Sequence, residues 1–398
     1  MKIGFVIPAW PGDRHANGIT TTVCYLAEGT ETLGHEVTII PLNDGVSDDD
    51  RVVALPPARD MTVFERITSR LKLADPVHEV MGERIAAAAQ TAIHSRGIDV
   101  LVMEETQGWA KTVQDRLPIP VIVTLHGPWF IQTRVQKEKV LASDKRRERR
   151  EAQAFRECAG IASPSRNVLD ITRATVKDLA SAQAVIYNPI LPKAPVCYEQ
   201  LDEKQRKSIL FVGRHDLRKG ADTLLQGFAE LVGQGADVYL TFIGPDPGVT
   251  QANGSQVFIN EALSRLGQEV ERRVTYLGHC SKAEIDVQRQ QHLLTLITSR
   301  YETFGYTVLE ALSAGSATIS TDAGGPAEII RDGETGLLVP PGDPTALANA
   351  CMRILNDPDL AASFGQAARH DVNARFAPEK IAAQLVKFSE QVIAQSKR

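Results

Sequence analysis

The strongest constraint on the fold is an alternation of short apolar runs with helical patterns that occurs twice along the chain. Each apolar run is a few residues long, is rich in aliphatic and β-branched side chains, and ends at a polar or glycine-containing loop, as buried parallel strands do. Longer stretches between the runs, such as 20–33 and 83–94, have the spacing of helices. The expected strands are 3–7, 37–40, 100–103, 121–125 and 184–187 in the first half, and 208–213, 238–243, 274–277, 292–298 and 317–321 in the second.

Two series of this kind predict an α/β protein with two Rossmann-like, doubly wound domains. Three prolines, Pro189, Pro192 and Pro195, separate the series and exclude a central strand there. Ligands of open α/β sheets bind beyond the carboxyl ends of the strands, so we expect the two domains to face each other across a substrate cleft. The expected parts are an N-terminal domain over 1–188, a linker over 189–207, a C-terminal domain over 208–375 and a helix over 376–398 that crosses back to the N-terminal domain.

Composition narrows the classes of function. The 398 residues include 43% hydrophobic and 23% charged residues, as in ordinary globular proteins. Lys and Arg number 44 against 49 Asp and Glu, so the net charge of −5 gives no support to a nucleic-acid partner. The first apolar run ends at Pro8, too early for a secretory signal, and no window approaches the ~18 apolar residues of a spanning helix. We therefore expect a cytoplasmic protein.

The cysteines and the acidic runs do not indicate a metal site. The five cysteines are scattered and form no C-x-x-C pair, which argues against structural zinc and against a disulfide framework. The acidic runs 48–50 and 357–359 do not follow a buried strand, where an Asp-x-Asp metal site is expected. We therefore predict no metal and no cofactor.

Polar loops follow the expected strands of the first half. Gly12 and Gly18 precede a helix, where backbone amides can approach an anion closely. Their spacing does not match G-x-G-x-x-G, which disfavours a dinucleotide oxidoreductase. His126 follows the strand 121–125, where an imidazole can donate to a sugar hydroxyl or polarise a reacting group. A simple turn and a packed histidine are the alternatives.

The second half carries two richer loops. Arg214 and Lys219 lie five residues apart in a loop that opens a helix, and two cations at a helix N-terminus suit a diphosphate. A surface charge pair is the alternative. Further along, Glu302 lies in a short loop and Glu310 lies in the helix that begins near Gly305. In this context Glu302 suits sugar hydroxyls, Glu310 suits ribose hydroxyls, and the amides at the start of the helix suit a phosphate.

Together these segments resemble the retaining glycosyltransferases of family GT4, which have the GT-B fold. Glu302-x7-Glu310 is similar to the E-x7-E signature of the family, and Gly213-Arg214 with Lys219-Gly220 is similar to its phosphate loop. Further resemblance lies in the glycine segments 321–328 and 333–339 and in the sequence 34–37.

The resemblance implies a retaining hexosyltransferase of the EC 2.4 class, acting in polysaccharide biosynthesis. The donor would be a nucleotide-diphosphate sugar, with UDP favoured and GDP as the alternative, and the acceptor a hydroxyl of a saccharide, glycan or glycolipid. The implied catalytic residues are His126, Arg214, Lys219 and Glu302. The implied donor-binding residues are Gly18, Gly213, Cys280, Phe304, Gly305, Tyr306, Thr307 and Glu310.

Arg214 and Lys219 would balance the charge of the departing diphosphate, so we expect catalysis without a metal ion. Two other functions stay open: a GT-B sugar-nucleotide epimerase or phosphorylase-like enzyme, and a catalytically silent sugar-nucleotide sensor. The sequence does not predict the oligomeric state.

Two residues are candidates for binding the acceptor. Glu104 and Trp129 follow expected strands and combine a carboxylate with an aromatic face, which suits a saccharide acceptor and equally suits loop packing.

The basic run 137–156 predicts a charged helix with i,i+4 pairs. Peripheral contact with anionic lipid at the inner face of a membrane, or with an acidic acceptor, is the alternative.

Overall fold

The computed structural model describes residues 1–11, 18–43, 47–70, 75–136, 140–251 and 254–397, without the side chains of residues 64, 68 and 136. The chain divides into two compact units, and each is described by itself. The first unit comprises Met1–Pro189 and Pro378–Arg398, and the second comprises Ile190–Ala377.

The first unit is built on a parallel sheet of six strands in the order β2-β1-β3-β4-β5-β6. The aliphatic side chains of β1 to β5 are buried, as the apolar runs predict, whereas Ala184 and Val185 of the edge strand β6 are half-buried. The strands are β1 (Lys2–Ile7), β2 (Glu36–Pro41), β3 (Val100–Glu104), β4 (Val121–Thr124), β5 (Gly160–Ser163) and β6 (Gln183–Val185).

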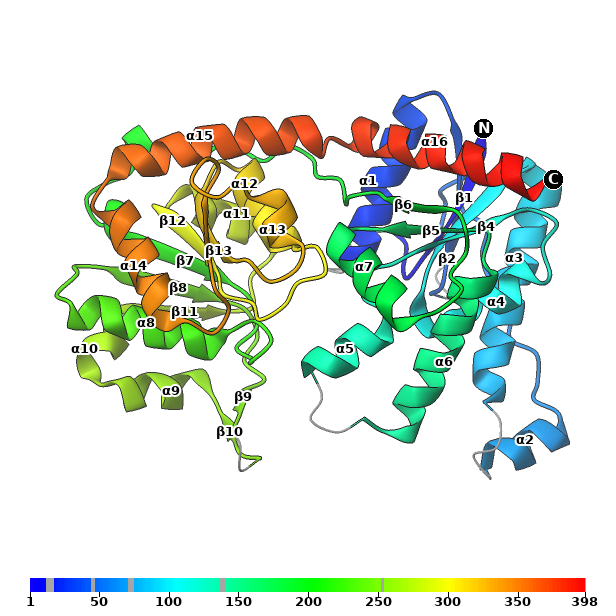
Figure 1. Ribbon diagram of the computed structural model, residues 1–398, viewed down its shortest axis with the longest axis horizontal. Helices are drawn as coiled ribbons and strands as arrows, with labels where there is room; N and C mark the ends of the chain where they lie inside the picture. Colours follow the sequence, from blue (N-terminus) through cyan, green and yellow to red (C-terminus); the bar gives the residue numbers. More distant parts are fainter. Residues whose placement is uncertain (12–17, 44–46, 71–74, 137–139, 252–253, 398) are drawn as a thin grey trace. The chain divides into compact units, whose positions relative to one another are not determined.

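The helices of the first unit include one from the far end of the chain. Helix α16 (Pro378–Ser396) packs on α1 (Gly18–Thr32), and Figure 1 shows the two in red and blue. Gly29 permits this close approach, because a Cβ there would lie 2.4 Å from the carbonyl oxygen of Pro378. The other helices are α2 (Val63–Arg70), α3 (Pro76–Arg96), α4 (Trp109–Gln114), α5 (Trp129–Gln136), α6 (Ala142–Glu157) and α7 (Arg166–Thr175).

The second unit has its own parallel sheet of six strands, in the order β11-β8-β7-β12-β13-β14. A short antiparallel pair, β9 (Val249–Thr250) and β10 (Gln256–Val257), stands apart from it. The strands of the main sheet are β7 (Ser208–Val212), β8 (Tyr239–Ile243), β11 (Val274–Gly278), β12 (Leu294–Ile297), β13 (Ala317–Thr321) and β14 (Leu337–Val339).

Helices follow most strands of the second unit, as expected for a doubly wound sheet. They are α8 (Ala221–Gly233), α9 (Ile259–Leu266), α10 (Gln268–Glu271), α11 (Lys282–Gln290), α12 (Tyr306–Ser313), α13 (Pro326–Ile329), α14 (Pro344–Leu355) and α15 (Pro358–Arg375).

The strand order determines where each unit can bind a ligand. In the second unit the chain adds β8 and β11 on one side of β7, and then β12 and the later strands on the other side. Because this reversal lies between β7 and β12, the crevice for a ligand is expected where the loops after these two strands leave the sheet. The corresponding reversal in the first unit lies between β1 and β3.

The two parallel-sheet α/β units confirm the expected fold class, but two strands of the six-stranded sheets, and the short pair of β9 and β10, were not anticipated. Strand β5 has the sequence Gly-Ile-Ala-Ser, which lacks the β-branched run used to recognise strands. Its small residues have a packing reason, because a Cβ at Gly160 would lie 2.8 Å from Cγ2 of Val392 on α16. Strand β14 lies inside 333–339, which the sequence marked only as a glycine segment.

The segment after Pro189, expected as a linker, makes specific contacts within the second unit. The Tyr198 hydroxyl accepts a hydrogen bond from the Ala317 amide at 2.6 Å and donates one to the Gly315 carbonyl at 3.0 Å. The Val196 amide donates to the Ala314 carbonyl at 2.8 Å. These bonds anchor the segment beside α12 and β13.

The close approach of α1 and α16 leads to a stability prediction. Gly29→Ala should lower the free energy of unfolding by about 1–3 kcal/mol, because the added methyl group has no room beside the Pro378 carbonyl. Gly233→Ala in α8 is the matched control, since its Cβ meets nothing within 4 Å. Thermal denaturation should give a lower Tm for Gly29→Ala alone. Equal Tm values for the two variants would contradict the packing described here.

Candidate functional site

The loops after β7 and β12 are joined by hydrogen bonds at the strand-order reversal of the second unit. The Thr298 hydroxyl lies 2.9 Å from the carbonyl oxygens of both Lys219 and Gly220. Gly220 has a φ of +64°, and a Cβ there would lie 1.8 Å from the Thr298 carbonyl oxygen. Because only glycine allows this approach, the loops after β7 and β12 lie against each other at one edge of the sheet.

A buried ion pair between Lys219 and Glu302 lies where the two loops meet. Their side chains are 16% and 10% exposed. The Ser299 hydroxyl also donates to Oε1 of Glu302 at 2.7 Å, and Arg218 Nη1 lies 3.9 Å from Oε2. Burial acts to raise the pKa of Glu302, but the charges of Lys219 and Arg218 and the hydrogen bonds outweigh it, and the pKa lies below its usual value. Glu302 is therefore an ionised carboxylate.

A third loop fixes the backbone of Glu302. The Glu302 amide donates to the Ala323 carbonyl at 3.2 Å, and the Gly325 amide donates to the Glu302 carbonyl at 2.9 Å. A Cβ at Gly324, whose φ is +86°, would lie 2.2 Å from that carbonyl oxygen. The glycines after β13 thus hold the Glu302 loop.

Arg214 lies in the same loop as Lys219 but in a more open environment. Its side chain is 48% exposed and forms an ion pair with Asp216 at 2.7 Å. The other oxygen of Asp216 accepts a hydrogen bond from the Lys219 amide at 2.8 Å, which helps to shape the loop. The Gly213 amide donates to the Ile243 carbonyl of β8 at 2.9 Å. The two cations expected from the sequence thus lie in different environments, with Arg214 exposed and Lys219 largely buried.

Glu310, in the middle of α12, has a buried cation as its partner. Nη2 of Arg289 donates to Oε2 of Glu310 at 2.7 Å, and Nη1 of the same side chain donates to Oδ1 of Asp286 at 2.9 Å. Arg289 comes from α11 and is only 1% exposed, whereas Glu310 is 22% exposed. Sequence reasoning missed Arg289, and no motif marks it.

The remaining expected donor contacts lie in different environments. Gly305 has a φ of +103° and precedes the first residue of α12, Tyr306, so the amides of Tyr306 and Thr307 lie in the first turn. The Phe304 ring is buried, with its centroid 5.9 Å from that of Phe376. Only the backbone of Phe304 therefore remains for a ligand. Cys280 is a half-buried free thiol that follows the edge strand β11.

In the first unit, a buried carboxylate fixes the backbone around His126. Oε2 of Glu105 accepts a hydrogen bond from the His126 amide at 2.9 Å, and Oε1 accepts one from the Gly127 amide at 2.7 Å. Burial of the imidazole lowers the pKa of His126 to about 4, so the ring is neutral at pH 7. A neutral imidazole can donate one hydrogen bond and accept another.

The two residues expected to bind the acceptor are engaged inside the unit. Glu104 is buried and accepts a hydrogen bond from the Thr106 hydroxyl at 3.0 Å, and burial raises its pKa to about 7. The indole Nε1 of Trp129 donates to Asp144 at 3.0 Å, and the guanidinium of Arg147 lies 3.9 Å from the centroid of the ring. Their role toward an acceptor stays a prediction.

Gly18 is the first residue of α1, and its carbonyl accepts a hydrogen bond from the Thr22 hydroxyl at 2.8 Å. Gly12, the other glycine of that loop, lies outside the described residues.

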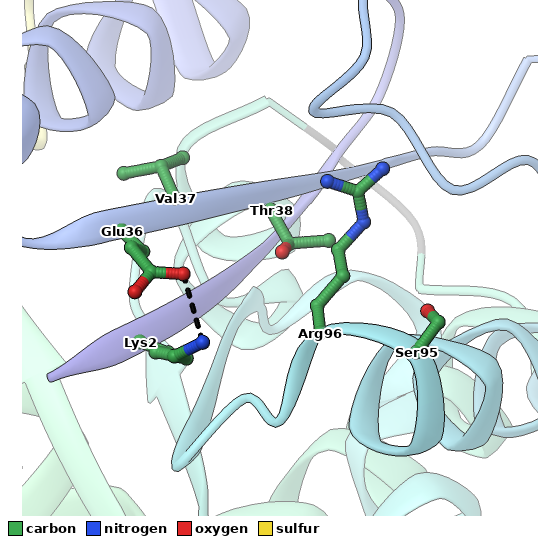
Figure 2. Close-up of a pocket in the computed structure, with 6 residues that line it drawn as sticks. All are labelled: Lys2, Glu36, Val37, Thr38, Ser95 and Arg96. Carbon is green, nitrogen blue, oxygen red and sulfur yellow. Dashed lines mark ion pairs between the residues drawn. The ribbon is translucent and has the colours of Figure 1, made fainter.

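A polar pocket of about 240 Å³ lies at the opposite end of the sheet of the first unit (Figure 2). Lys2 and Glu36 pair across it at 2.9 Å, at the starts of β1 and β2, and Arg96 at the end of α3 lines its other side. Because ligands of open α/β sheets bind at the carboxyl ends of strands, this pocket does not belong to the expected site.

The acidic runs have local structural roles. Asp49 forms an ion pair with Arg51 at 2.7 Å, and Asp357 caps the N-terminus of α15 by accepting from the Leu360 amide at 3.0 Å. Within the described ranges, no group of three or more His, Cys, Asp or Glu side chains is arranged to hold a metal ion. In the same part of the chain, no helix combines the length and apolarity needed to cross a bilayer.

Comparison with known proteins gives matches along most of the chain. Residues 199–371 match the family model "Glycosyl transferases group 1", and residues 16–192 match "Glycosyltransferase Family 4". A phosphatidyl-myo-inositol mannosyltransferase of Mycolicibacterium smegmatis is 25% identical over 98% of the chain and 94% of its own length. Three other curated relatives are 30% identical, but the matched stretch spans less than half of their lengths.

Two solved structures show the same fold. Sucrose-phosphate synthase from Thermosynechococcus elongatus superimposes with a TM-score of 0.76 at 24% identity, covering 99% of this chain and all of that one. HepE from Anabaena, in complex with UDP, gives 0.68 at 18% identity over 98% of this chain and all of that one. At these identities the likeness concerns the fold alone.

The neutral state of His126 gives a prediction for stability at acid pH. The folded pKa of about 4 lies below the ordinary value of 6.5, so between these values the unfolded chain binds the proton and the folded chain does not. Stability should therefore fall as the pH is lowered through this window, by at most about 3 kcal/mol from this group. Thermal denaturation at pH 7 and pH 4.5 should show a smaller drop for His126→Gln. An equal drop in both proteins would contradict the assignment.

Proposed function

The chain belongs to the glycosyl transferases of group 1, and we propose that it moves a hexose from a nucleotide-diphosphate sugar to a hydroxyl of a saccharide or glycolipid acceptor. UDP is the favoured nucleotide, with GDP as the alternative; the UDP complex of the structural neighbour HepE supports this choice.

One observation carries this proposal: the strand-order reversal of the second unit brings Lys219, Arg214 and Glu302 to one edge of the sheet, beside the start of α12. Cations with a helix N-terminus suit a diphosphate, and an ionised carboxylate beside Lys219 suits the hydroxyls of a sugar. Glu310, in the middle of α12, suits the hydroxyls of a ribose.

In the proposed reaction the bond from the anomeric carbon to the diphosphate breaks, and negative charge develops on the departing phosphate. Lys219 and Arg214 would stabilise that charge, which is the task of a metal ion in other transferases, so no metal is required. Lys219 is paired with Glu302 in this structure. Donor binding would therefore move the Lys219 ammonium from the carboxylate toward a phosphate oxygen, while donor hydroxyls donate to Glu302.

We propose that the configuration of the anomeric carbon is retained, as in the family that the sequence resembles. In the proposed donor complex Glu302 accepts from the Ser299 hydroxyl and from the donor hydroxyls, so attack of the acceptor hydroxyl from the same face, assisted by the leaving phosphate, fits better than a covalent intermediate on Glu302. His126, neutral at pH 7, can donate a hydrogen bond to the transferred sugar.

The role of the cations can be tested by mutation. Lys219→Ala and Arg214→Ala should each reduce transfer by about 10²–10³-fold, because each removes a fixed charge from the developing diphosphate. Arg272→Ala is a matched control, since this exposed arginine of the same unit pairs only with Glu269 among the described residues. Turnover of radiolabelled UDP-hexoses, with NMR assignment of the product anomer, gives both the rate and the stereochemistry.

EDTA should leave the wild-type rate unchanged. Normal turnover in both cation variants, or activity lost in EDTA and restored by manganese, would overturn the phosphate assignment. An inverted anomer would overturn retention alone.

We further propose that the outer face of α6 contacts an anionic membrane surface. Within the basic run, Arg147 and Arg150 pair with Glu151 and Asp75, whereas Lys145, Arg149 and Arg156 line a groove of about 370 Å³ together with one carboxylate, that of Glu148. Phe130 and Val176 also line this groove and give it an apolar part. Cations around apolar surface suit an amphiphilic anion. Lys137 and Lys139 lie outside the described residues.

Vesicle binding tests this surface. Wild-type protein should sediment with vesicles that contain phosphatidylglycerol and not with pure phosphatidylcholine. Joint replacement of Lys145, Arg149 and Arg156 by Gln should weaken binding at least tenfold, since each basic residue near such a surface contributes about 1 kcal/mol. Replacing Arg265 and Arg272 by Gln is the control. The proposal would be overturned if the protein bound both kinds of vesicle equally well, or if the triple variant bound anionic vesicles as tightly as wild type.

A further inference from the structure

The carboxylate of Glu310 is held on one oxygen and open on the other. Arg289 Nη2 lies 2.7 Å from Oε2. Among the residues that the structure describes, none donates a hydrogen bond to Oε1, and the side chain is 22% exposed. One fixed oxygen and one accessible oxygen are what a carboxylate needs to accept from an external hydroxyl in a defined direction.

Arg289 is fixed more firmly than its partner. It lies on α11, is 1% exposed, and bridges two carboxylates because Nη1 reaches Asp286 Oδ1 at 2.9 Å. The planar guanidinium presents its donors in a rigid fork, so holding Asp286 with one arm sets the direction of the other. Lys193 Nζ lies 2.9 Å from Oδ2 of Asp286 and holds that carboxylate in turn.

The charges of this group balance, with two cations and two carboxylates. Removing the Arg289 charge would leave Glu310 and Asp286 with Lys193 alone, and among the described residues the Lys193 ammonium pairs with Asp286 and not with Glu310. Glu310 would then lose the contact that fixes its rotamer. The Nε of Arg289 is buried and has no partner among the described residues, so the side chain is held by its two Nη contacts.

We infer that Arg289 is a positioning residue that fixes Glu310 so that its free oxygen accepts from the ribose hydroxyls of the donor nucleotide. This inference rests on the proposed function, which assigns the ribose to Glu310, and it adds a residue that no motif of the sequence marks. Arg289 itself touches no substrate. Its effect should therefore be confined to the part of the nucleotide that Glu310 contacts.

The test compares ligands as well as proteins. Calorimetry measures the Kd of UDP and of 2′,3′-dideoxy-UDP for wild type, Arg289→Met and Arg273→Met; the GDP pair is used if wild type does not bind UDP. Wild type should prefer the ribose form by about tenfold, because hydrogen bonds to a charged acceptor are among the stronger ones. In Arg289→Met this preference should fall below about threefold. Arg273, which pairs with Glu269 and Asp237 on the same unit, is the matched control and should keep the preference.

A general loss of folded protein would weaken both ligands equally and leave their ratio unchanged, so the ratio separates positioning from stability. Full preference in Arg289→Met overturns the inference. No preference in wild type overturns the ribose assignment of the proposed function itself.

If Arg289→Met does not fold, a crystal structure of the wild type with UDP decides. The inference requires Oε1 of Glu310 within hydrogen-bond distance of a ribose hydroxyl while Oε2 keeps Arg289. Any other arrangement of these three groups overturns it.

Discussion

The ion pair between Lys219 and Glu302 joins the two loops on which the proposed donor site depends. Both groups are largely removed from water, and leaving one of them without a counter-charge would cost roughly 3–5 kcal/mol. A donor diphosphate can therefore recruit Lys219 only if Glu302 finds other partners. Arg218, 3.9 Å away, and the Ser299 hydroxyl remain beside it, and the hydroxyls of a sugar can supply further donors. The donor would therefore exchange contacts within a group of balanced charges. An anion without sugar hydroxyls would bind less well than the donor, because it would take Lys219 without giving Glu302 new hydrogen-bond donors.

The first unit uses buried carboxylates in a different way. Glu105 binds the amides of His126 and Gly127, and Glu151 binds the Trp129 amide at 2.6 Å and Arg147. Burial raises the pKa of Glu105 to about 8 and also raises that of Glu151, so the ionised form of each group carries an electrostatic penalty. The amide hydrogen bonds offset part of that penalty and fix the loop after β4. The neutral His126 and the stacked Trp129 thus owe their positions to carboxylates that lie behind them.

The sequence was sufficient to predict the strands that carry the site and insufficient to predict its supporting residues. Arg214, Lys219 and Glu302 follow buried strands, and a parallel sheet brings the carboxyl ends of neighbouring strands together, so their proximity follows from topology. Arg289 lies in a charged helix, 21 residues before Glu310, and its burial depends on how α11 packs, which no periodicity encodes. For Trp129 the sequence left acceptor binding and loop packing open, because it does not show that the indole N–H is bound to Asp144. Strand β5 was missed because small residues chosen for packing under α16 carry no strand signal.

The two carboxylates of the E-x7-E segment differ in the kind of cation that each meets. Glu302 pairs with a lysine, whose ammonium is a point charge on a flexible stem and can move between acceptors; Glu310 pairs with an arginine fork that also binds Asp286. In the proposed reaction, charge changes at the diphosphate and the anomeric carbon, but not at the ribose. The exchangeable pair therefore lies on the side where charge develops, and the rigid pair lies on the side that needs only a constant direction. This division gives a physical reason for a lysine at position 219 and an arginine at position 289, and it implies that exchanging the two residue types would impair both ends of the donor site.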